Sequence, residues 1–186
     1  MPKYAMVIDQ RRCVACMACV VACKKENDVP PGQFRTRVVE EVEGKFPLLR
    51  MELRSELCNH CDNPPCVYNC PTGASYKHKE DGLVLLKKYR CVGCKSCIAA
   101  CPYDARYINE EKGFADKCTM CDHRIKEGKE PACVATCVGK SRIFGDLDDP
   151  KSPVTIALKE NHAEVLLACA GTKPRIYYIK KFSKPE

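Results

Sequence analysis

Seventeen cysteines in 186 residues constrain this chain more than any other feature of its sequence. Sixteen of them fall into four groups of four, and this pattern is the internal repeat of the protein. Groups one and three follow C-x2-C-x2-C-x3-C, whereas group two widens its middle gap to four residues and group four to eleven. In chain order the groups are Cys13, Cys16, Cys19, Cys23; Cys58, Cys61, Cys66, Cys70; Cys91, Cys94, Cys97, Cys101; and Cys118, Cys121, Cys133, Cys137.

Cysteines at this spacing indicate metal rather than disulfides. The count is odd, and residues 1–12 show no export signal, so a disulfide framework is disfavoured. A cubane cluster needs four thiolates at the corners of a compact cube, and cysteines two residues apart let one tight loop reach three corners. Zinc also uses C-x2-C pairs, but a third cysteine two residues on and a fourth three beyond is the wrong arrangement for most zinc ribbons. The sequence therefore predicts four 4Fe-4S clusters on all sixteen cysteines.

The spacing alone leaves open how the fourth corner of each cluster is filled. In the bacterial ferredoxin pattern the last cysteine ligates the partner cluster, so two groups exchange their fourth ligands. Twenty residues separate Cys70 from Cys91, which suits groups two and three as neighbouring halves of one module, with groups one and four as the other. Sequential pairing, of group one with two and three with four, stays open. The nested clusters would be Cys13, Cys16, Cys19 with Cys137; Cys118, Cys121, Cys133 with Cys23; Cys58, Cys61, Cys66 with Cys101; and Cys91, Cys94, Cys97 with Cys70.

The formal charge of +7 would suit a nucleic-acid-binding surface, with Arg175, Lys180 and Lys181 in its footprint. Sixteen thiolates and four oxidised cluster cores of about +2 each would bring that charge to roughly −1. We therefore interpret the scattered lysines and arginines as counter-charges for anionic clusters, and we expect no nucleic-acid partner.

The predicted fold class is α+β, with two nested bacterial-ferredoxin-like modules, few regular elements and a C-terminal tail. Clusters would take the space that apolar side chains fill in an ordinary domain. We expect short strands at 4–8, 83–86 and 176–179, helical turns at 98–101 and 134–137, a turn-rich connector at 144–153 and a helix at 154–160. The predicted boundaries are 1–55 with 106–145 for the first module, 56–105 for the second and 146–186 for a docking tail.

Other reactive side chains receive ordinary interpretations. Cys169 lies in an apolar stretch and is interpreted as a small buried hydrophobe. His60 and His123 sit beside cysteines, and we expect them to lie at the surface or to hydrogen-bond near a sulfur atom. Ser141 has no nucleophile context and no phosphate-binding glycine loop is present, so we expect no catalytic residues.

With these groups in place, the chain resembles the four-cluster ferredoxin-like subunit of molybdopterin oxidoreductases, the family of polysulfide, thiosulfate, tetrathionate and dimethyl sulfoxide reductases. The resemblance runs from about residue 4 to residue 179. It is carried by Cys13–Cys23, by CNHCDNPPC at 58–66, CPTGAS at 70–75, AACPYDARY at 99–107 and KCTMC at 117–121, and by FGDLDDP at 144–150 and GTKP at 171–174.

The resemblance implies the nested pairing and a non-catalytic, electron-transferring role. The implied partners are a molybdopterin catalytic subunit with molybdenum or tungsten and a quinone-binding membrane-anchor subunit, in a respiratory polysulfide, thiosulfate or tetrathionate reductase. Its implied location is membrane-associated through those partners, at the extracytoplasmic face after co-export with the catalytic subunit, or else at the cytoplasmic face. The longest apolar run, 163–170, is too short for a direct membrane span. A freely diffusing polyferredoxin and a zinc-stabilised nucleic-acid-binding module are the alternatives.

Overall fold

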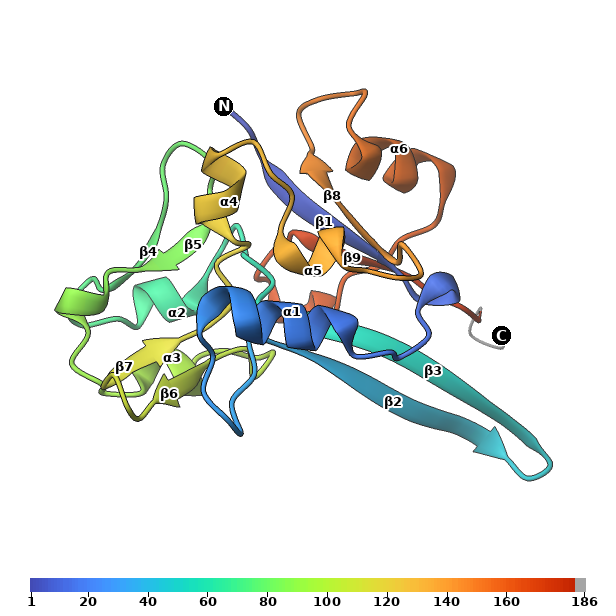
Figure 1. Ribbon diagram of the computed structural model, residues 1–186, viewed down its shortest axis with the longest axis horizontal. Coiled ribbons are helices and arrows are strands. Elements are labelled where there is room, and N and C mark those ends of the chain that lie inside the picture. The colour runs from blue at the N-terminus through green and yellow to red at the C-terminus, as the bar shows by residue number, and fades with distance from the viewer. Residues whose placement is uncertain (183–186) are drawn as a thin grey trace.

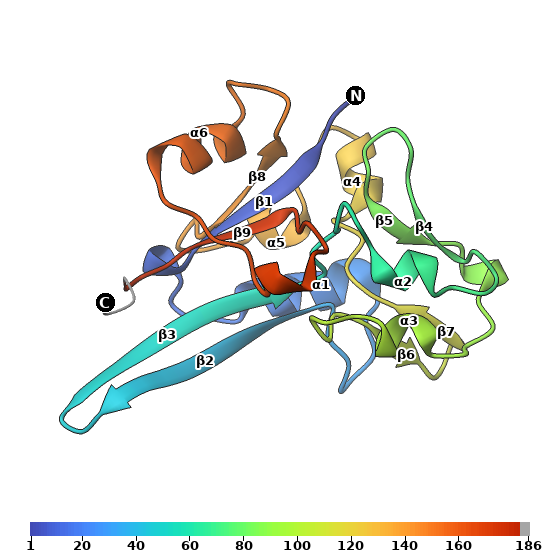
Figure 2. The same cartoon turned by 180° about the vertical axis from the view of Figure 1, so that it is seen from behind.

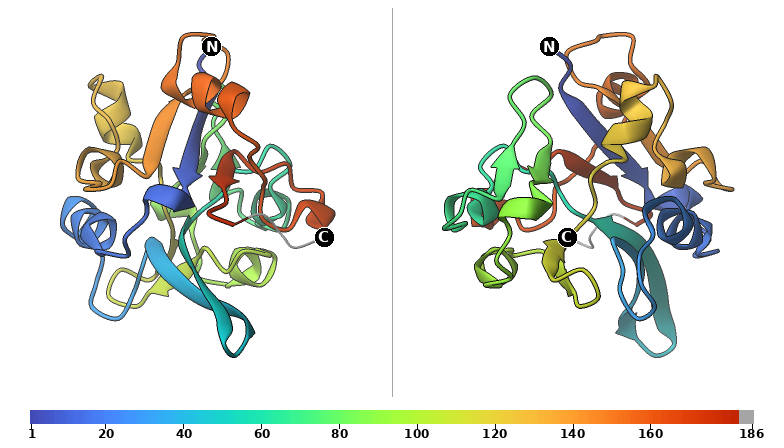
Figure 3. Two further views of the ribbon diagram at one scale, coloured as in Figure 1. Left: turned by 90° about the vertical axis from the view of Figure 1, so that its right-hand side faces the viewer. Right: turned by 60° about the vertical axis from the view of Figure 1, so that its left-hand side comes forward.

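A three-stranded sheet joins the two ends of the sequence in the computed structural model, which describes residues 1–182. Its central strand β1 (Tyr4–Asp9) runs antiparallel to β8 (Arg142–Asp146) and parallel to β9 (Ile176–Ile179), as Figure 3 shows in its left-hand view. The last regular strand of the chain is therefore part of the same sheet as the first.

Strand β1 is buried on both faces, which explains its continuous apolar run. Because side chains alternate along a strand, Met6 and Ile8 enter the core beside the cysteine groups, whereas Ala5 and Val7 face the other way. Helix α6 (Pro153–Glu160) covers that second face with Val154 and other apolar side chains (Figure 1).

A long β-hairpin projects from the body of the molecule (Figures 1 and 2). Strands β2 (Thr36–Lys45) and β3 (Leu48–Leu57) pair antiparallel over their full length. At the base of the hairpin Thr36 and Leu57 are buried, whereas Phe46 at the tip is 88% exposed. The base therefore belongs to the core, and the tip extends into solvent.

The cysteine groups adopt two local backbone patterns. In groups one and three, helices α1 (Ala18–Asn27) and α3 (Ser96–Ala99) begin after Met17 and Lys95, which have left-handed φ values of 59° and 62°. In groups two and four, helices α2 (Pro65–Tyr68) and α5 (Ala132–Ala135) begin directly after a proline that fixes φ, Pro64 or Pro131. Helix α1 packs against α5, and α2 packs against α3. The remaining elements are η1 (Gln10–Arg12), β4 (Ser75–Lys77), β5 (Val84–Leu86), η2 (Lys88–Arg90), β6 (Tyr107–Asn109), β7 (Phe114–Asp116), α4 (Asp122–Lys126) and η3 (Ala168–Ala170).

The predicted α+β class with few regular elements is confirmed, as are the three short strands and the helix before residue 160. The two helical turns lie about two residues earlier than expected, because the left-handed Lys95 and Pro131 set where they begin. Helix α1 is longer than its counterparts because Lys24 follows Cys23, whereas Pro71 and Pro102 follow Cys70 and Cys101 and stop the chain from continuing as a helix.

Two predictions were wrong. The turn-rich connector at 144–153 contains the second half of strand β8, which pairs with β1 and is therefore ordered by a distant part of the chain. Cys169 is exposed rather than buried, because it lies in the 3-10 turn η3 on the surface, and Leu167 just before it is also exposed.

Truncating Ile176 tests whether the tail stabilises the core. Its side chain is fully buried, so Ile176→Ala should lower the free energy of unfolding by about 2–5 kcal/mol, seen as a lower melting temperature under anaerobic conditions. The matched control Ile156→Ala changes a side chain that is 42% exposed on α6 and should melt close to the unaltered protein. Equal melting temperatures for the two variants would contradict the packing of β9.

Candidate metal centres

All sixteen grouped cysteines are free of disulfides, and their burial differs along the molecule. Nine are buried, five are partly buried, and only Cys16 and Cys94 are exposed. Most of the sulfur atoms therefore lie inside the protein, with one exposed cysteine in each of groups one and three.

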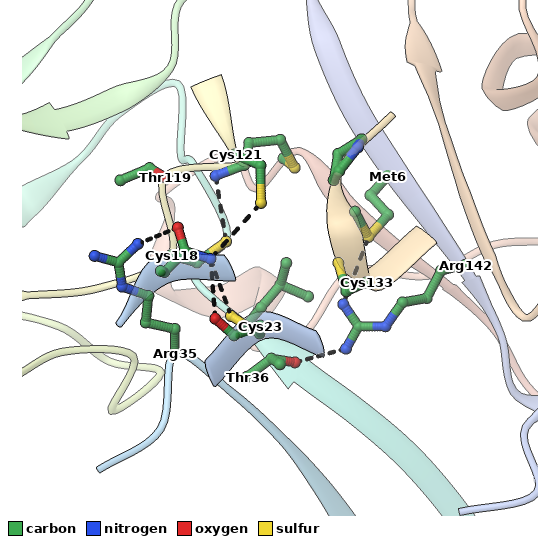
Figure 4. Close-up of a pocket in the computed structure, with 13 residues that line it drawn as sticks. Met6, Cys23, Arg35, Thr36, Cys118, Thr119, Cys121, Cys133 and Arg142 are labelled. Atoms are coloured by element: carbon green, nitrogen blue, oxygen red, sulfur yellow. Dashed lines mark hydrogen bonds between the residues drawn. The ribbon is translucent and has the colours of Figure 1, made fainter. Parts of the chain in front are cut away.

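Four sulfur atoms from groups one and four converge on a single pocket (Figure 4). Cys118, Cys121 and Cys133 line it together with Cys23, the last cysteine of group one. The side-chain amide of Asn27 lies 3.7 Å from the Sγ of Cys23 and 3.8 Å from that of Cys121. Group four thus meets the last residue of group one, although 94 positions separate Asn27 from Cys121.

A second set joins group two to the last cysteine of group three. Burial raises the pKa of the Cys61 thiol to about 12, and the nearby charges of Cys58, Cys66 and Cys101 raise it further. Burial likewise raises the pKa of Cys101, and the charges of Cys58 and Cys66 add to that effect. These four sulfur atoms are therefore close neighbours in the structure.

The remaining groups are defined by fewer contacts. Hydrogen bonding with Ser96 lowers the pKa of Cys94, while the charge of Cys70 raises it, so the last cysteine of group two lies near group three. The backbone N–H groups of Ser75 and Ser141 donate to the Sγ atoms of Cys70 and Cys137 over 3.3 and 3.2 Å. Equivalent backbone hydrogen bonds therefore support the last cysteines of groups two and four.

Contacts between cysteines of different sets place the sets in a line. Burial raises the pKa of Cys133, and the charge of Cys19 from group one adds to it. Burial also raises the pKa of Cys118, with a contribution from Cys58, and the pKa of Cys97, with a contribution from Cys66. The order is therefore group one, group four, group two and group three, and the exposed Cys16 and Cys94 lie in the two end groups.

The donor sets fit iron-sulfur clusters. Burial raises the pKa of Cys23 to about 12, with added contributions from Cys133 and Cys121, so metal-free thiols there would resist ionisation. Cationic iron supplies the compensating charge, and four converging sulfur atoms are the usual ligands of a 4Fe-4S cubane. When bound, such clusters accept and release single electrons, while the protein sets their potentials through burial, charge and hydrogen bonds to sulfur.

Several buried polar residues around the cysteines were not identified from the sequence. Arg106 donates to the Sγ of Cys66 over 3.0 Å, and Arg142 lies beside Cys133 in the pocket of Figure 4. Lys117 is 1% exposed, and its ammonium donates to the backbone carbonyls of Val84 and Cys118. Only spatial contacts distinguish these cations from the surface arginines and lysines of the chain.

Neither histidine lies where it could replace a sulfur ligand. His60 is fully buried, and its Nδ1 accepts a hydrogen bond from the backbone N–H of Val84 over 3.2 Å. The Nε2 of His123 lies 2.8 Å from a carboxylate oxygen of Glu26. These contacts assign both side chains to structural roles.

Two other sequence features are also structural. Arg175, considered above as part of a nucleic-acid footprint, is buried and pairs with Asp62 over 2.6 Å. Ser141 is buried and donates to the backbone carbonyl of Asp9 over 2.7 Å. Neither side chain is free to contact a solvent-borne partner.

No helix within residues 1–182 has both the length and the apolar character needed to cross a lipid bilayer.

Comparison with known proteins places these centres in a family. Residues 12–74 and 49–147 each match a 4Fe-4S dicluster domain. One subunit of the tetrathionate reductase of Salmonella typhimurium is 48% identical over 182 residues, spanning 95% of this chain and 72% of that protein. The tetrathionate reductase subunit of the same name in Archaeoglobus fulgidus is 45% identical, spanning 95% and 82%. The arsenate respiratory reductase iron-sulfur subunit of a Shewanella species is 36% identical, spanning 97% of both chains.

Two dicluster domains correspond to four 4Fe-4S clusters, the number that the four cysteine groups predict. The related chains are the iron-sulfur subunits of their oxidoreductases and not the catalytic ones. The chain therefore belongs to the four-cluster 4Fe-4S electron-transfer subunits of the molybdopterin oxidoreductases.

Proposed function

We propose that this chain conducts electrons through four clusters between a quinone-binding membrane-anchor subunit and a molybdopterin catalytic subunit that carries molybdenum or tungsten. The observation that carries the proposal is the linear order of the cysteine sets, with an exposed cysteine in each end group. A line of clusters with accessible ends gives an electron one point of entry and one of exit. The likeness to two tetrathionate reductase subunits favours tetrathionate, over polysulfide or thiosulfate, as the substrate of the complex.

The proposed ligand sets follow the nested pairing. Support comes from the pocket that Cys23 shares with group four, and from the packing of α1 on α5 and of α2 on α3. We therefore propose modules of residues 1–55 with 106–145, and of 56–105, followed by the tail 146–186. The proposed clusters are Cys13, Cys16, Cys19 with Cys137; Cys118, Cys121, Cys133 with Cys23; Cys58, Cys61, Cys66 with Cys101; and Cys91, Cys94, Cys97 with Cys70.

Exposed apolar side chains surround both ends of the line. Around the first end these are Val14, Met17, Val21 and Val138, which lie next to cysteines of groups one and four in the sequence. Around the other end they are Tyr68, Tyr89 and Val92, beside cysteines of groups two and three. Exposed apolar groups at two separate ends favour two docked partners over a freely diffusing polyferredoxin. We place the assembled complex at the extracytoplasmic face of the membrane, where a co-exported catalytic subunit would carry this chain.

The nested pairing can be tested by counting intact clusters in double variants. Cys23→Ala and Cys118→Ala each remove a ligand of the same proposed cluster, so the double variant should keep three intact 4Fe-4S clusters, as each single variant does. The comparison pair Cys23→Ala with Cys58→Ala removes ligands of two proposed clusters and should keep two. Mössbauer and EPR spectroscopy of anaerobically purified protein measure these numbers. Sequential pairing predicts the reverse pattern.

Purification from the native membrane tests the assembly. A tagged chain, solubilised gently without oxygen, should retain a larger subunit with molybdenum or tungsten and a membrane subunit. Within that complex, a quinol should reduce the clusters, and tetrathionate should reoxidise them faster than nitrate or arsenate. Recovery of a cluster-loaded monomer without partners would favour the polyferredoxin alternative.

A further inference from the structure

Two buried arginines occupy equivalent positions in the repeat. Arg106 follows Cys101, the last cysteine of group three, by five residues, and Arg142 follows Cys137, the last of group four, by the same distance. Their exposed fractions are 5% and 3%. The chain therefore places one buried guanidinium at the same point after two different cysteine groups.

Arg106 lies between groups two and three. Its Nη2 donates to the Sγ of Cys66 over 3.0 Å and to the hydroxyl of Ser75 over 2.8 Å. Burial raises the pKa of Cys97, and the positive charge of Arg106 counteracts that effect, so the same guanidinium also lies near Cys97. Arg106 thus contacts the third cysteine of each of these groups.

Arg142 has the corresponding position between groups one and four. Its guanidinium donates to the hydroxyls of Thr36, over 2.6 Å, and Ser55. Burial lowers the pKa of Arg142, but the net shift is upward because of the negative charges of Cys133 and Cys19, which lie close to it. These are again the third cysteines of their groups, and Figure 4 shows Arg142 beside Cys133.

Neither guanidinium has a protein anion for a partner. Within residues 1–182, no carboxylate lies within ion-pair distance of Arg106 or Arg142, whereas the buried Arg35 pairs with Asp116 over 2.9 Å. In addition, Nη1 of Arg106 and Nε of Arg142 are buried without a hydrogen-bond partner. A buried charge without a counter-charge is strongly destabilising, so each arginine requires an anion in the space beside it. Clusters held by the adjacent cysteines supply that negative charge.

We propose that Arg106 and Arg142 each bridge two neighbouring clusters and raise the reduction potentials of both. Reduction adds negative charge to a cluster, and a fixed cation in a buried, weakly screened site favours the reduced form. Because each guanidinium touches the third cysteine of two groups, each one acts on two clusters. Together the two arginines set the potentials of all four.

This inference rests on the four clusters but not on the pairing of their fourth ligands. The third cysteine of a group serves the cluster of its own group under nested and sequential pairing alike. A failure of the double-variant test above would therefore leave the arginine proposal intact, and the reverse also holds.

The test is an EPR-monitored redox titration of the purified complex with Arg106→Gln or Arg142→Gln. Each variant should lower two of the four potentials by about 59 mV or more, the equivalent of a tenfold change in a one-electron equilibrium, and each should affect a different pair. Arg106→Lys and Arg142→Lys keep the charge and should restore most of the loss. The control Arg50→Gln removes an exposed arginine from the hairpin and should leave all four potentials unchanged. Iron and sulfide contents must match the unaltered protein.

Three results would overturn the proposal: unchanged potentials in cluster-loaded glutamine variants, a shift of a single cluster, or an equal shift in the Arg50→Gln control. If a glutamine variant loses its clusters, the unaltered complex decides. With 15N-guanidino-labelled arginine, pulsed EPR of the reduced clusters should detect nitrogen couplings that change in the two lysine variants. Absence of those couplings would equally refute the bridging role.

Discussion

The rest of the structure depends on compensation of buried negative charge. Nine of the grouped cysteines are buried, and burial alone opposes their ionisation, as the raised pKa values of Cys23, Cys61 and Cys118 illustrate. Iron provides the main compensation, and the buried cations Arg106, Arg142 and Lys117 are the protein's own contribution. The fold can be sparse in helices and strands because clusters and their ligands hold the interior together.

The few long elements connect what the clusters alone would leave separate. Strand β1 pairs with β8 and β9, which brings the first residues, the segment after group four and the tail into one sheet. The base of the β2–β3 hairpin contributes Thr36 and Ser55, whose hydroxyls orient Arg142. A hairpin that extends into solvent at its tip is thus also a support for a buried charge at its base.

The order of the cysteine sets links the architecture to electron transfer. Close approaches between Cys19 and Cys133, between Cys118 and Cys58, and between Cys66 and Cys97 connect neighbouring sets, so the third cysteine of a group recurs at these junctions. Arg142 and Arg106 lie at the first and last of them. The positions where an electron would pass between clusters therefore coincide with the positions where the chain has buried a positive charge.

The sequence by itself determined the metal, the number of clusters and the α+β class, because ligand chemistry is encoded in the spacing of the cysteines along a short stretch of chain. It also located the short strands at both ends, whose apolar runs are local signals. Only the tertiary structure decided the order of the cysteine sets, the paired strand β8, the exposure of Cys169 and the selection of Arg106 and Arg142 among 31 basic residues. Each of these depends on contacts between residues far apart in the chain, and no local pattern distinguishes a buried guanidinium from a solvated one.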